Sequence, residues 1–387
     1  MRTFKGYLKS FLLLLVVLAG FSYTVFGRSN PVELSLPPAI YAVPGYELNI
    51  YFDNIVLTPD IAQYRFIVKC AYGKQDARHW TLIPKTAKPK QFIWQVKIVD
   101  SKGQTAAKGK TTIYVSDSNA GEGKNLSLMM VGDSLTDATV YPSDLFFLLR
   151  KPGNPKMRFI GSHSHYGAKP NGGVAHEGYA GWAWGTFLSA WGKLKNDKKD
   201  YRRRSKFIRM VNGKTQLDFQ HYCDQYNNGK APDYITILLG ANDLIFTKND
   251  NLKSRVKSIM RNADKLLTEF HKVGPKTKIG IILLFPPAGT NDAFKANYGN
   301  KQTHNQYRRN QHFLVEKMIE KYAEGKIANV SLIPANVNID CMNNYPRKMG
   351  KDKIMRLSNA LHPAKAGYAQ IANSIFFWLK YQLAHAD

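Results

Sequence analysis

Residues 126–135 carry the sequence LSLMMVGDSL, in which a largely apolar run ends at Gly132 and Asp133 and Ser134 follow directly. A run without polar alternation is typical of a strand buried on both faces of a sheet. Similar runs occupy 234–239, 279–285 and 330–333, and a weaker one occupies 157–160. Helical patterns separate them, at 143–150, 252–273, 305–323 and 364–383. This alternation predicts an α/β fold with a parallel sheet covered by helices on both faces.

The position of Ser134 after the first run has a functional meaning. Ligands of parallel α/β sheets bind beyond the carboxyl ends of the strands. Asn242 follows the run at 234–239 in the same way that Ser134 follows the run at 126–131. The sequence therefore predicts a site at this edge of the sheet.

The first third of the chain has a different pattern. Residues 31–118 contain short segments rich in branched and aromatic residues, punctuated by Gly, Pro, Asn and Asp. The segments are 46–52, 63–69, 91–99 and 111–115. This spacing predicts a small β-sandwich domain. Residues 119–124 are small and polar and are predicted to link it to a catalytic domain at 125–387.

The N-terminus has the pattern of a targeting segment. Arg2, Lys5 and Lys9 precede an apolar run at 11–26 that Gly20 interrupts. Residues 1–27 are therefore predicted to be a secretory signal peptide, which implies a periplasmic, cell-surface or secreted protein. The alternative is a retained N-terminal anchor, and only in that case does the sequence imply a membrane contact.

Charge and cysteine content narrow the candidate partners. The 387 residues carry a formal net charge of +27, and nine Lys and Arg residues crowd into 193–209. Such a segment is either a solvated face or an attraction for an anionic partner, such as an acidic glycan. No nucleic-acid-binding motif is evident, and the three cysteines have no metal-binding spacing. They are interpreted as buried free thiols, with one disulfide as the alternative.

Four short blocks supply the groups that acyl transfer needs. They are 132–135 (GDSL), 177–181 (EGYAG), 240–243 (GAND) and 359–363 (NALHP). They offer a serine nucleophile, a glycine amide, an asparagine amide and a histidine base. Each block alone is a common turn or cap, but together, in this order, they indicate one site.

This arrangement resembles the SGNH, or GDSL, hydrolase superfamily over residues 125–383. The resemblance implies a flavodoxin-like three-layer α/β/α sandwich and a serine esterase or lipase without metal or cofactor. It assigns the nucleophile to Ser134, whose amide also serves the oxyanion hole, and the base to His362. Gly181 supplies a backbone oxyanion donor, with Gly178 as the alternative, and Asn242 supplies a side-chain donor.

The sequence departs from the family pattern at Asn359, where the family carries an aspartate three residues before the histidine. Three interpretations remain: a Ser134–His362 dyad in which Asn359 or a carbonyl orients the imidazole, an acid from elsewhere, or a weak or inactive site. Asp133 is interpreted as a structural acceptor and Asp137 as a cap.

Trp182, Trp184 and Leu244 follow the glycine and asparagine blocks and are interpreted as core residues, with an acyl pocket as the alternative. His163, His165 and His176 are interpreted as polar loop residues rather than metal ligands.

The leading functional hypothesis is an exported serine esterase that removes small acyl groups, above all acetyl, from a carbohydrate. The positive charge of the chain favours an anionic carbohydrate. A lipase or thioesterase for longer chains, and a glycan-binding surface protein with weak catalysis, are the alternatives. The sequence assigns no oligomeric state.

Overall fold

The computed structural model describes residues 32–170 and 173–385, so the predicted signal peptide lies outside the described residues. Its centre is a parallel sheet with the order β11-β10-β15-β16-β17. The strands are β10 (Asn125–Gly132), β11 (Lys156–Ile160), β15 (Tyr234–Leu238), β16 (Lys278–Ile282) and β17 (Val330–Ile333), and the two-residue β12 (Glu177–Gly178) pairs with the end of β10. The prediction of a parallel α/β sheet is confirmed, and the apolar runs are its strands.

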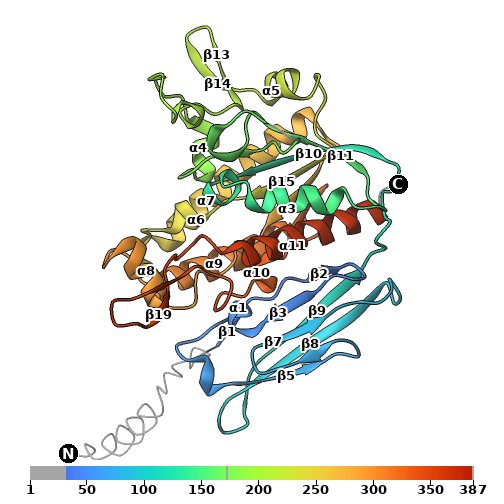
Figure 1. Ribbon diagram of the computed structural model, residues 1–387, viewed down its shortest axis with the longest axis vertical. Coiled ribbons are helices and arrows are strands. Elements are labelled where there is room, and N and C mark those ends of the chain that lie inside the picture. Colours follow the sequence, from blue (N-terminus) through green and yellow to red (C-terminus); the bar gives the residue numbers. More distant parts are fainter. Residues whose placement is uncertain (1–31, 171–172, 386–387) are drawn as a thin grey trace, which may run out of the picture. The chain divides into compact units, whose positions relative to one another are not determined.

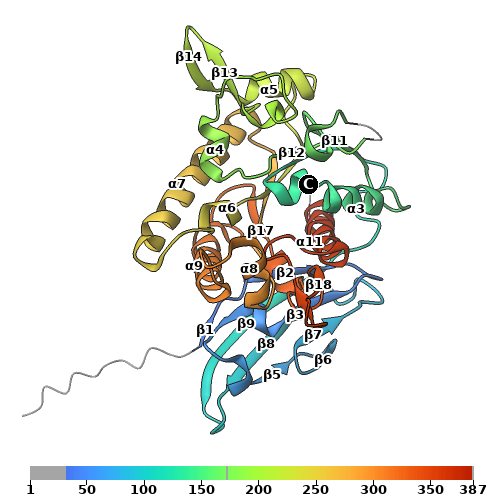
Figure 2. The same cartoon turned by 60° about the vertical axis from the view of Figure 1, so that its left-hand side comes forward.

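Helices cover both faces of this sheet (Figures 1 and 2). Helices α3 (Val140–Leu149) and α11 (Lys365–Ala384) lie on one face. The other face carries α4 (Trp184–Ser189), α6 (Ala241–Leu244), α7 (Asn249–Val273) and α9 (His304–Tyr322). The predicted helices agree with α3, α7, α9 and α11 to within about three residues, and each of the four buries apolar residues in the core.

Shorter elements connect these layers. The helices are α2 (Ser134–Asp137), α5 (Phe219–Tyr226), α8 (Asn291–Tyr298) and α10 (Ala335–Asn338). Two antiparallel pairs extend from the sheet, formed by β13 (Ile208–Val211) with β14 (Lys214–Leu217) and by β18 (Arg347–Met349) with β19 (Met355–Leu357).

The segment before the sheet is rich in strands. A four-stranded sheet has the order β2-β9-β8-β5, from β2 (Ala39–Ala42), β5 (Arg65–Lys69), β8 (Gln91–Val99) and β9 (Thr105–Val115). A three-stranded sheet joins β3 (Leu48–Tyr51), β7 (His79–Leu82) and β6 (Lys74–Gln75). Strands β1 (Glu33–Leu34) and β4 (Val56–Leu57) form a separate pair, and α1 (Phe52–Ile55) precedes β4.

Buried hydrogen bonds join this segment to the rest of the chain. Residues Val32–Asp387 form one compact unit. The Arg308 guanidinium on α9 donates to the carbonyls of Asp53, Asn54 and Val56 at 2.8–3.0 Å. The Asn54 side chain donates in turn to the carbonyl of Ile339 at 2.8 Å. Because the two segments share these buried contacts, the structure does not separate the β-rich segment from the rest of the chain. An independent sandwich domain with a linker at 119–124 remains a prediction.

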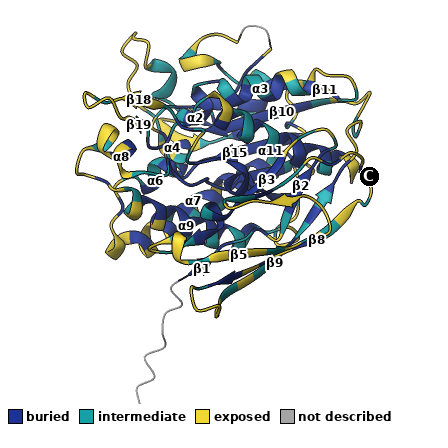
Figure 3. Ribbon diagram, turned by 60° about the horizontal axis from the view of Figure 1, so that its bottom comes forward, coloured by how far each residue is buried: buried dark blue, intermediate teal, exposed yellow. Residues whose placement is uncertain are grey.

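The central strands and the inner faces of the helices are buried (Figure 3). Cys223 and Cys341 are buried, Cys70 is half-buried, and all three are free thiols. Within residues 32–170 and 173–385, no helix combines the length and apolar character needed to cross a membrane.

The strand order places a topological switch point between β10 and β15. From β10 the chain moves to β11 on one side, whereas from β15 it moves to β16 and β17 on the other. The chain segments after β10 and β15 therefore leave the sheet in opposite directions, and in open α/β sheets ligands bind at such a point. Ser134 begins α2 and Asn242 lies in α6, the short helices that follow these two strands.

Candidate active site

Ser134 is held at the end of β10 by a tight turn into α2. Asp133 caps this helix, since its Oδ1 accepts from the Leu135 N–H at 3.0 Å. A Cβ atom at Gly132 would lie 1.9 Å from Thr136 Oγ1, so only glycine fits there. The Ser134 N–H donates to no group among the described residues. The turn thus presents both the hydroxyl and a free backbone donor at the helix N-terminus.

His362 reaches Ser134 from the loop before α11. Ser134 Oγ and His362 Nε2 are 2.8 Å apart, a hydrogen-bond distance, although 228 residues separate them in sequence. The loop is fixed from two sides: Asn297 Oδ1 accepts from the Ala360 N–H at 2.6 Å, and the Ala360 carbonyl accepts from the Ala288 N–H at 2.9 Å. This backbone anchoring positions the imidazole next to the serine hydroxyl.

Asn359 holds the backbone of this loop and not the imidazole. Its Oδ1 accepts from the N–H groups of Leu361 at 3.1 Å and His362 at 2.9 Å. Neither amide atom of Asn359 contacts the ring among the described hydrogen bonds. Asn359 therefore positions His362 through its backbone, and its role in orienting the imidazole stays a prediction.

The second ring nitrogen of His362 has no partner among the described residues. Its Nε2 faces Ser134, and no carboxylate forms an ion pair with the ring within residues 32–170 and 173–385. Burial alone lowers the pKa of His362 below its ordinary value. A neutral imidazole is the form that can accept a proton from a serine hydroxyl.

The carboxylates near the site accept hydrogen bonds from groups other than His362. Asp137 Oδ2 accepts from the Ala180 N–H at 3.0 Å and from the Tyr201 hydroxyl at 2.6 Å. Asp243 Oδ2 accepts from the Trp184 N–H at 3.3 Å, and burial raises its pKa to about 6. Burial likewise raises the pKa of Asp133 to about 7. Among the described residues, no acid takes the place of the family's aspartate.

Gly181 and Gly178 differ in whether their amides are available. The Gly178 N–H donates to His176 Nδ1 at 3.1 Å, and a Cβ there would lie 2.6 Å from the Asp137 nitrogen. Gly181 is exposed with a φ of +83°, a left-handed conformation that favours glycine, and its N–H has no acceptor among the described residues. The geometry therefore favours Gly181 over Gly178 as a donor to a bound oxyanion.

Asn242 connects the serine and glycine blocks. Its Nδ2 donates to the Trp182 carbonyl at 2.8 Å, and Asp133 Oδ2 lies 3.4 Å away. The turn before it needs Gly240, which has a φ of +121° and would place a Cβ 2.8 Å from Leu314. One amide hydrogen is thus used to fix the side chain, and the second makes only a long contact. The structure brings the four blocks together around Ser134.

A buried polar network, which the local sequence pattern does not predict, supports the glycine block. The Glu177 carboxylate is fully buried and accepts from Ser162 N–H at 2.5 Å, from Tyr222 at 2.9 Å and from Tyr179. His163 Nε2 donates to the Gly178 carbonyl at 2.6 Å. The only sequence signal was that Glu177 opens the EGYAG block.

The second histidine of this network is locked as a neutral ring. His176 Nδ1 accepts from the Gly178 N–H, so its Nε2 must carry the hydrogen that Thr139 Oγ1 accepts at 2.8 Å. Burial lowers the pKa of His176 to about 3. His163 and His176 are thus buried supports of the glycine turn, rather than the polar loop residues expected.

The three residues that follow the glycine and asparagine blocks lie in the hydrophobic core. Trp184 and Leu244 are fully buried, and Trp182 stacks on Tyr179 with ring centroids 4.0 Å apart. Their burial supports the interpretation as core residues over the alternative of an acyl pocket. A cavity of about 1090 Å³ lies at the opposite ends of the strands, where Ser127, Arg158 and Asp233 line it.

Comparison with known proteins identifies the family. The sequence pattern described as GDSL-like Lipase/Acylhydrolase matches residues 128–375, which is more than half of the chain and includes all four blocks. The chain belongs to this family. The resemblance seen in the sequence is thus confirmed, and the GDSL-like acylhydrolase is a serine carboxylic ester hydrolase.

Several solved structures are similar to this GDSL-like acylhydrolase. A family 3 carbohydrate esterase from Clostridium thermocellum is 19% identical, with 67% of this chain and 100% of that chain covered and a TM-score of 0.38. The corresponding values are 16%, 68%, 100% and 0.37 for a family 3 carbohydrate esterase from Talaromyces cellulolyticus. A catalytic mutant of an acetylxylan esterase from Geobacillus stearothermophilus is 13% identical, with 69% of this chain and 100% of that chain covered and a TM-score of 0.36. No curated protein sequence matches the chain.

We expect the imidazole of His362 to titrate below its ordinary pKa of 6.5, because burial disfavours the imidazolium ion. Asn359→Asp would bring a negative charge to the same loop, which stabilises the imidazolium and raises this pKa. NMR titration measures both midpoints, with His362→Gln to assign the resonance. A midpoint above 6.5 in the unmodified protein, or a lower midpoint in Asn359→Asp, would contradict this electrostatic account.

Proposed function

We propose that this esterase acts through a Ser134–His362 dyad, and the 2.8 Å contact between Ser134 Oγ and His362 Nε2 carries the proposal. His362 takes the hydroxyl proton as Oγ bonds to the acyl carbon. The resulting oxyanion accepts hydrogen bonds from the N–H groups of Ser134 and Gly181 and from the Asn242 amide. His362 then protonates the leaving alcohol, and water releases the acid from the acyl-enzyme by the same steps in reverse order.

The surroundings of His362 support a dyad over a triad. Asn359 fixes the backbone of His362 but brings no charge to the ring, and no described acid contacts the ring. In a serine protease, loss of the charge at this position costs about 10⁴ in turnover. The proposed enzyme therefore depends more heavily on its oxyanion donors, each of which is worth roughly 10²–10³.

We propose a small acyl group, acetyl above all, as the acyl part of the ester substrate. The aromatic and aliphatic side chains that follow the glycine and asparagine blocks are buried in the core. The large cavity lies at the far ends of the strands from Ser134. Neither feature offers an apolar channel for a long acyl chain, which disfavours a lipase or thioesterase.

We propose a carbohydrate, preferably an anionic one, as the alcohol component, and an exported protein as the setting. The basic segment 193–209 packs against the glycine block, since Arg202 donates to the Ala180 carbonyl at 3.3 Å and accepts from Trp182 Nε1 at 3.1 Å. Arg203 pairs with Asp197 and Asp200. Lys195, Lys198 and Lys199 are exposed and have no ion-pair partner among the described residues. Positive charge beside the site would attract an acidic glycan.

Replacement of the proposed nucleophile tests the function directly. Ser134→Ala should lower the turnover of an acetyl ester, such as an acetylated oligosaccharide, by at least about 10³, because no other group can form the acyl-enzyme. Acetate release by purified protein is the measurement, with Ser143→Ala, a serine on α3, as the matched control. Equal rates for Ser134→Ala and the unmodified protein would exclude the serine mechanism. A rate that rises with acyl chain length would favour the lipase alternative.

Asn359→Asp tests the dyad. An aspartate can accept the same two N–H bonds from Leu361 and His362, and its second oxygen adds the missing charge. We expect the acetylesterase turnover to rise about tenfold near neutral pH, which corresponds to about 1.4 kcal/mol of transition-state stabilisation. Asn359→Ala, which removes the acceptor, should lower turnover and thermal stability together. A large loss in Asn359→Asp would show that the loop needs the amide itself.

The basic segment predicts a dependence on salt. With an acetylated uronic-acid polysaccharide, KM should rise between about 0.01 M and about 1 M salt, as the screening length falls from about 30 Å to about 3 Å. The double change Lys198→Gln/Lys199→Gln should raise KM at low salt without changing kcat. Lys97→Gln/Lys108→Gln, on the exposed strands β8 and β9, is the control. A KM that is independent of both salt and these lysines would refute electrostatic recruitment.

A further inference from the structure

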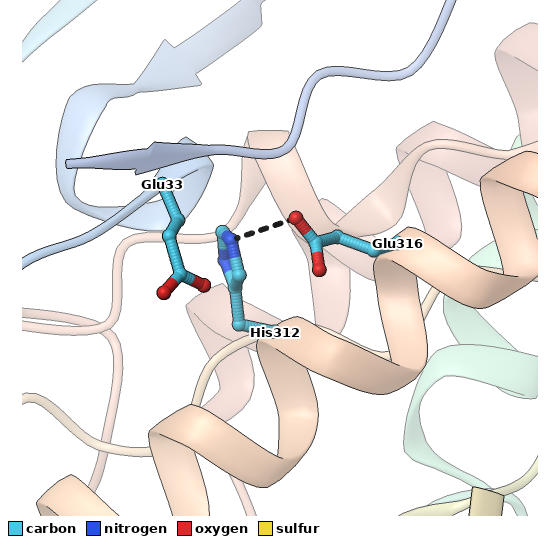
Figure 4. A group of neighbouring side chains, drawn as sticks. All are labelled: Glu33, His312 and Glu316. Carbon is cyan, nitrogen blue, oxygen red and sulfur yellow. Dashed lines mark ion pairs between the residues drawn. The ribbon is translucent and has the colours of Figure 1, made fainter. Parts of the chain in front are cut away.

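A second group of chemically active side chains lies outside the candidate active site. Glu33, His312 and Glu316 each offer one ligand atom, and these three atoms lie within 4.8 Å of one another. Figure 4 shows that Glu33 comes from the N-terminal strand pair, whereas His312 and Glu316 project from consecutive turns of helix α9. The group therefore joins the β-rich segment to the hydrolase fold.

The backbone holds this group in register. Arg308, His312 and Glu316 follow one another at intervals of four residues, so they share one face of α9. Arg308 fixes that face to the chain before β4 through its bonds to three carbonyls. Strand β4 pairs with β1, and Glu33 lies opposite Leu57. The arrangement thus rests on buried contacts and not on chance proximity of surface side chains.

His312 is the observation that points to a ligand. Its side chain is only 1% exposed, and Nε2 is buried without a hydrogen-bond partner among the described residues. The nearest acid atom, Glu316 Oε1, lies 3.7 Å away, which is too long for a hydrogen bond. A neutral imidazole is the form that coordinates metals.

The two carboxylates supply the charge that a cation requires. Ligand atoms of Glu33 and Glu316 lie within 4.8 Å of each other, and neither carboxylate pairs with a Lys or Arg among the described residues. Lys317, the neighbouring cation on the helix, instead pairs with Glu320 at 2.6 Å. A divalent ion between Glu33 and Glu316 would neutralise both acids and satisfy the buried nitrogen of His312.

We propose that Glu33, His312 and Glu316 bind a divalent transition-metal cation, zinc being the best match, and that this ion fastens β1 to α9. Zinc is commonly held by imidazole nitrogen and carboxylate oxygen at about 2.0–2.2 Å. Tetrahedral ligands at that range are about 3.3 Å apart, so the 3.7 Å pair needs little adjustment. The exposed Glu33 can close the remaining gap by a rotamer change, and water completes the coordination.

Zinc binding to the full chain, prepared with EDTA treatment and without a polyhistidine tag, tests the site. Isothermal titration with Zn²⁺ should show one equivalent bound, and zinc should raise the thermal unfolding midpoint because the ion binds only the folded state. Glu33→Gln and Glu316→Gln should each weaken binding at least tenfold and reduce the zinc-dependent shift. Both residues reach the surface, so these variants should fold even if His312→Gln does not.

Glu320→Gln is the matched control, since Glu320 lies one turn beyond Glu316 on α9 but outside the group. It should bind zinc as the unmodified protein does. The proposal is overturned if one equivalent does not bind at up to about 1 mM zinc. It is also overturned if Glu33→Gln and Glu316→Gln bind with unchanged affinity, or if Glu320→Gln causes an equal loss. Unfolding and titration report the ion without reference to ester hydrolysis.

Discussion

Strand β10 is hydrogen-bonded along both edges, and the candidate site depends on that pairing. Its start pairs with β11, its last two residues pair with β12, and β15 lies on the other edge. Parallel pairing aligns the carboxyl ends of these strands, so the serine, glycine and asparagine blocks emerge side by side. Only the histidine block comes from outside the sheet, from the loop before α11. Register in the sheet thus sets three of the four positions before any side chain contributes.

Buried polar groups complete the placement that the sheet begins. Glu177 lies in β12 opposite Val131 of β10. Its carboxylate accepts from Ser162, Tyr179 and Tyr222, which compensates for burying the charge. The Gly178 N–H donates to His176, whereas the Gly181 N–H has no acceptor among the described residues and can donate to a ligand. A network with each of these groups satisfied is rigid, and a rigid oxyanion site needs little reorganisation during the reaction.

Local pattern explains what the sequence could and could not predict. The strands, the long helices and the four blocks were found because burial on both faces leaves apolar runs and because strand ends need glycine and small polar residues. The burial of Trp184 and Leu244 depends on what packs over them, which no local pattern encodes. The same holds for Asn359, whose acceptor could have faced either the ring or the backbone. Glu33 and His312 are adjacent only in the folded chain, through Arg308 and the β1–β4 pair.

The environment of His362 determines what kind of catalyst this fold can be. A carboxylate at position 359 would both orient the ring and stabilise its charged form, whereas Asn359 retains only the anchoring of the backbone. Burial without a counter-charge keeps the imidazole neutral to a lower pH but makes it a weaker base. In the proposed Ser134–His362 dyad, proton transfer from Ser134 is then less favourable, so the proposed oxyanion donors must lower more of the barrier. The free N–H groups of Ser134 and Gly181, held by the buried network, are suited to that task because their geometry is fixed before the substrate arrives.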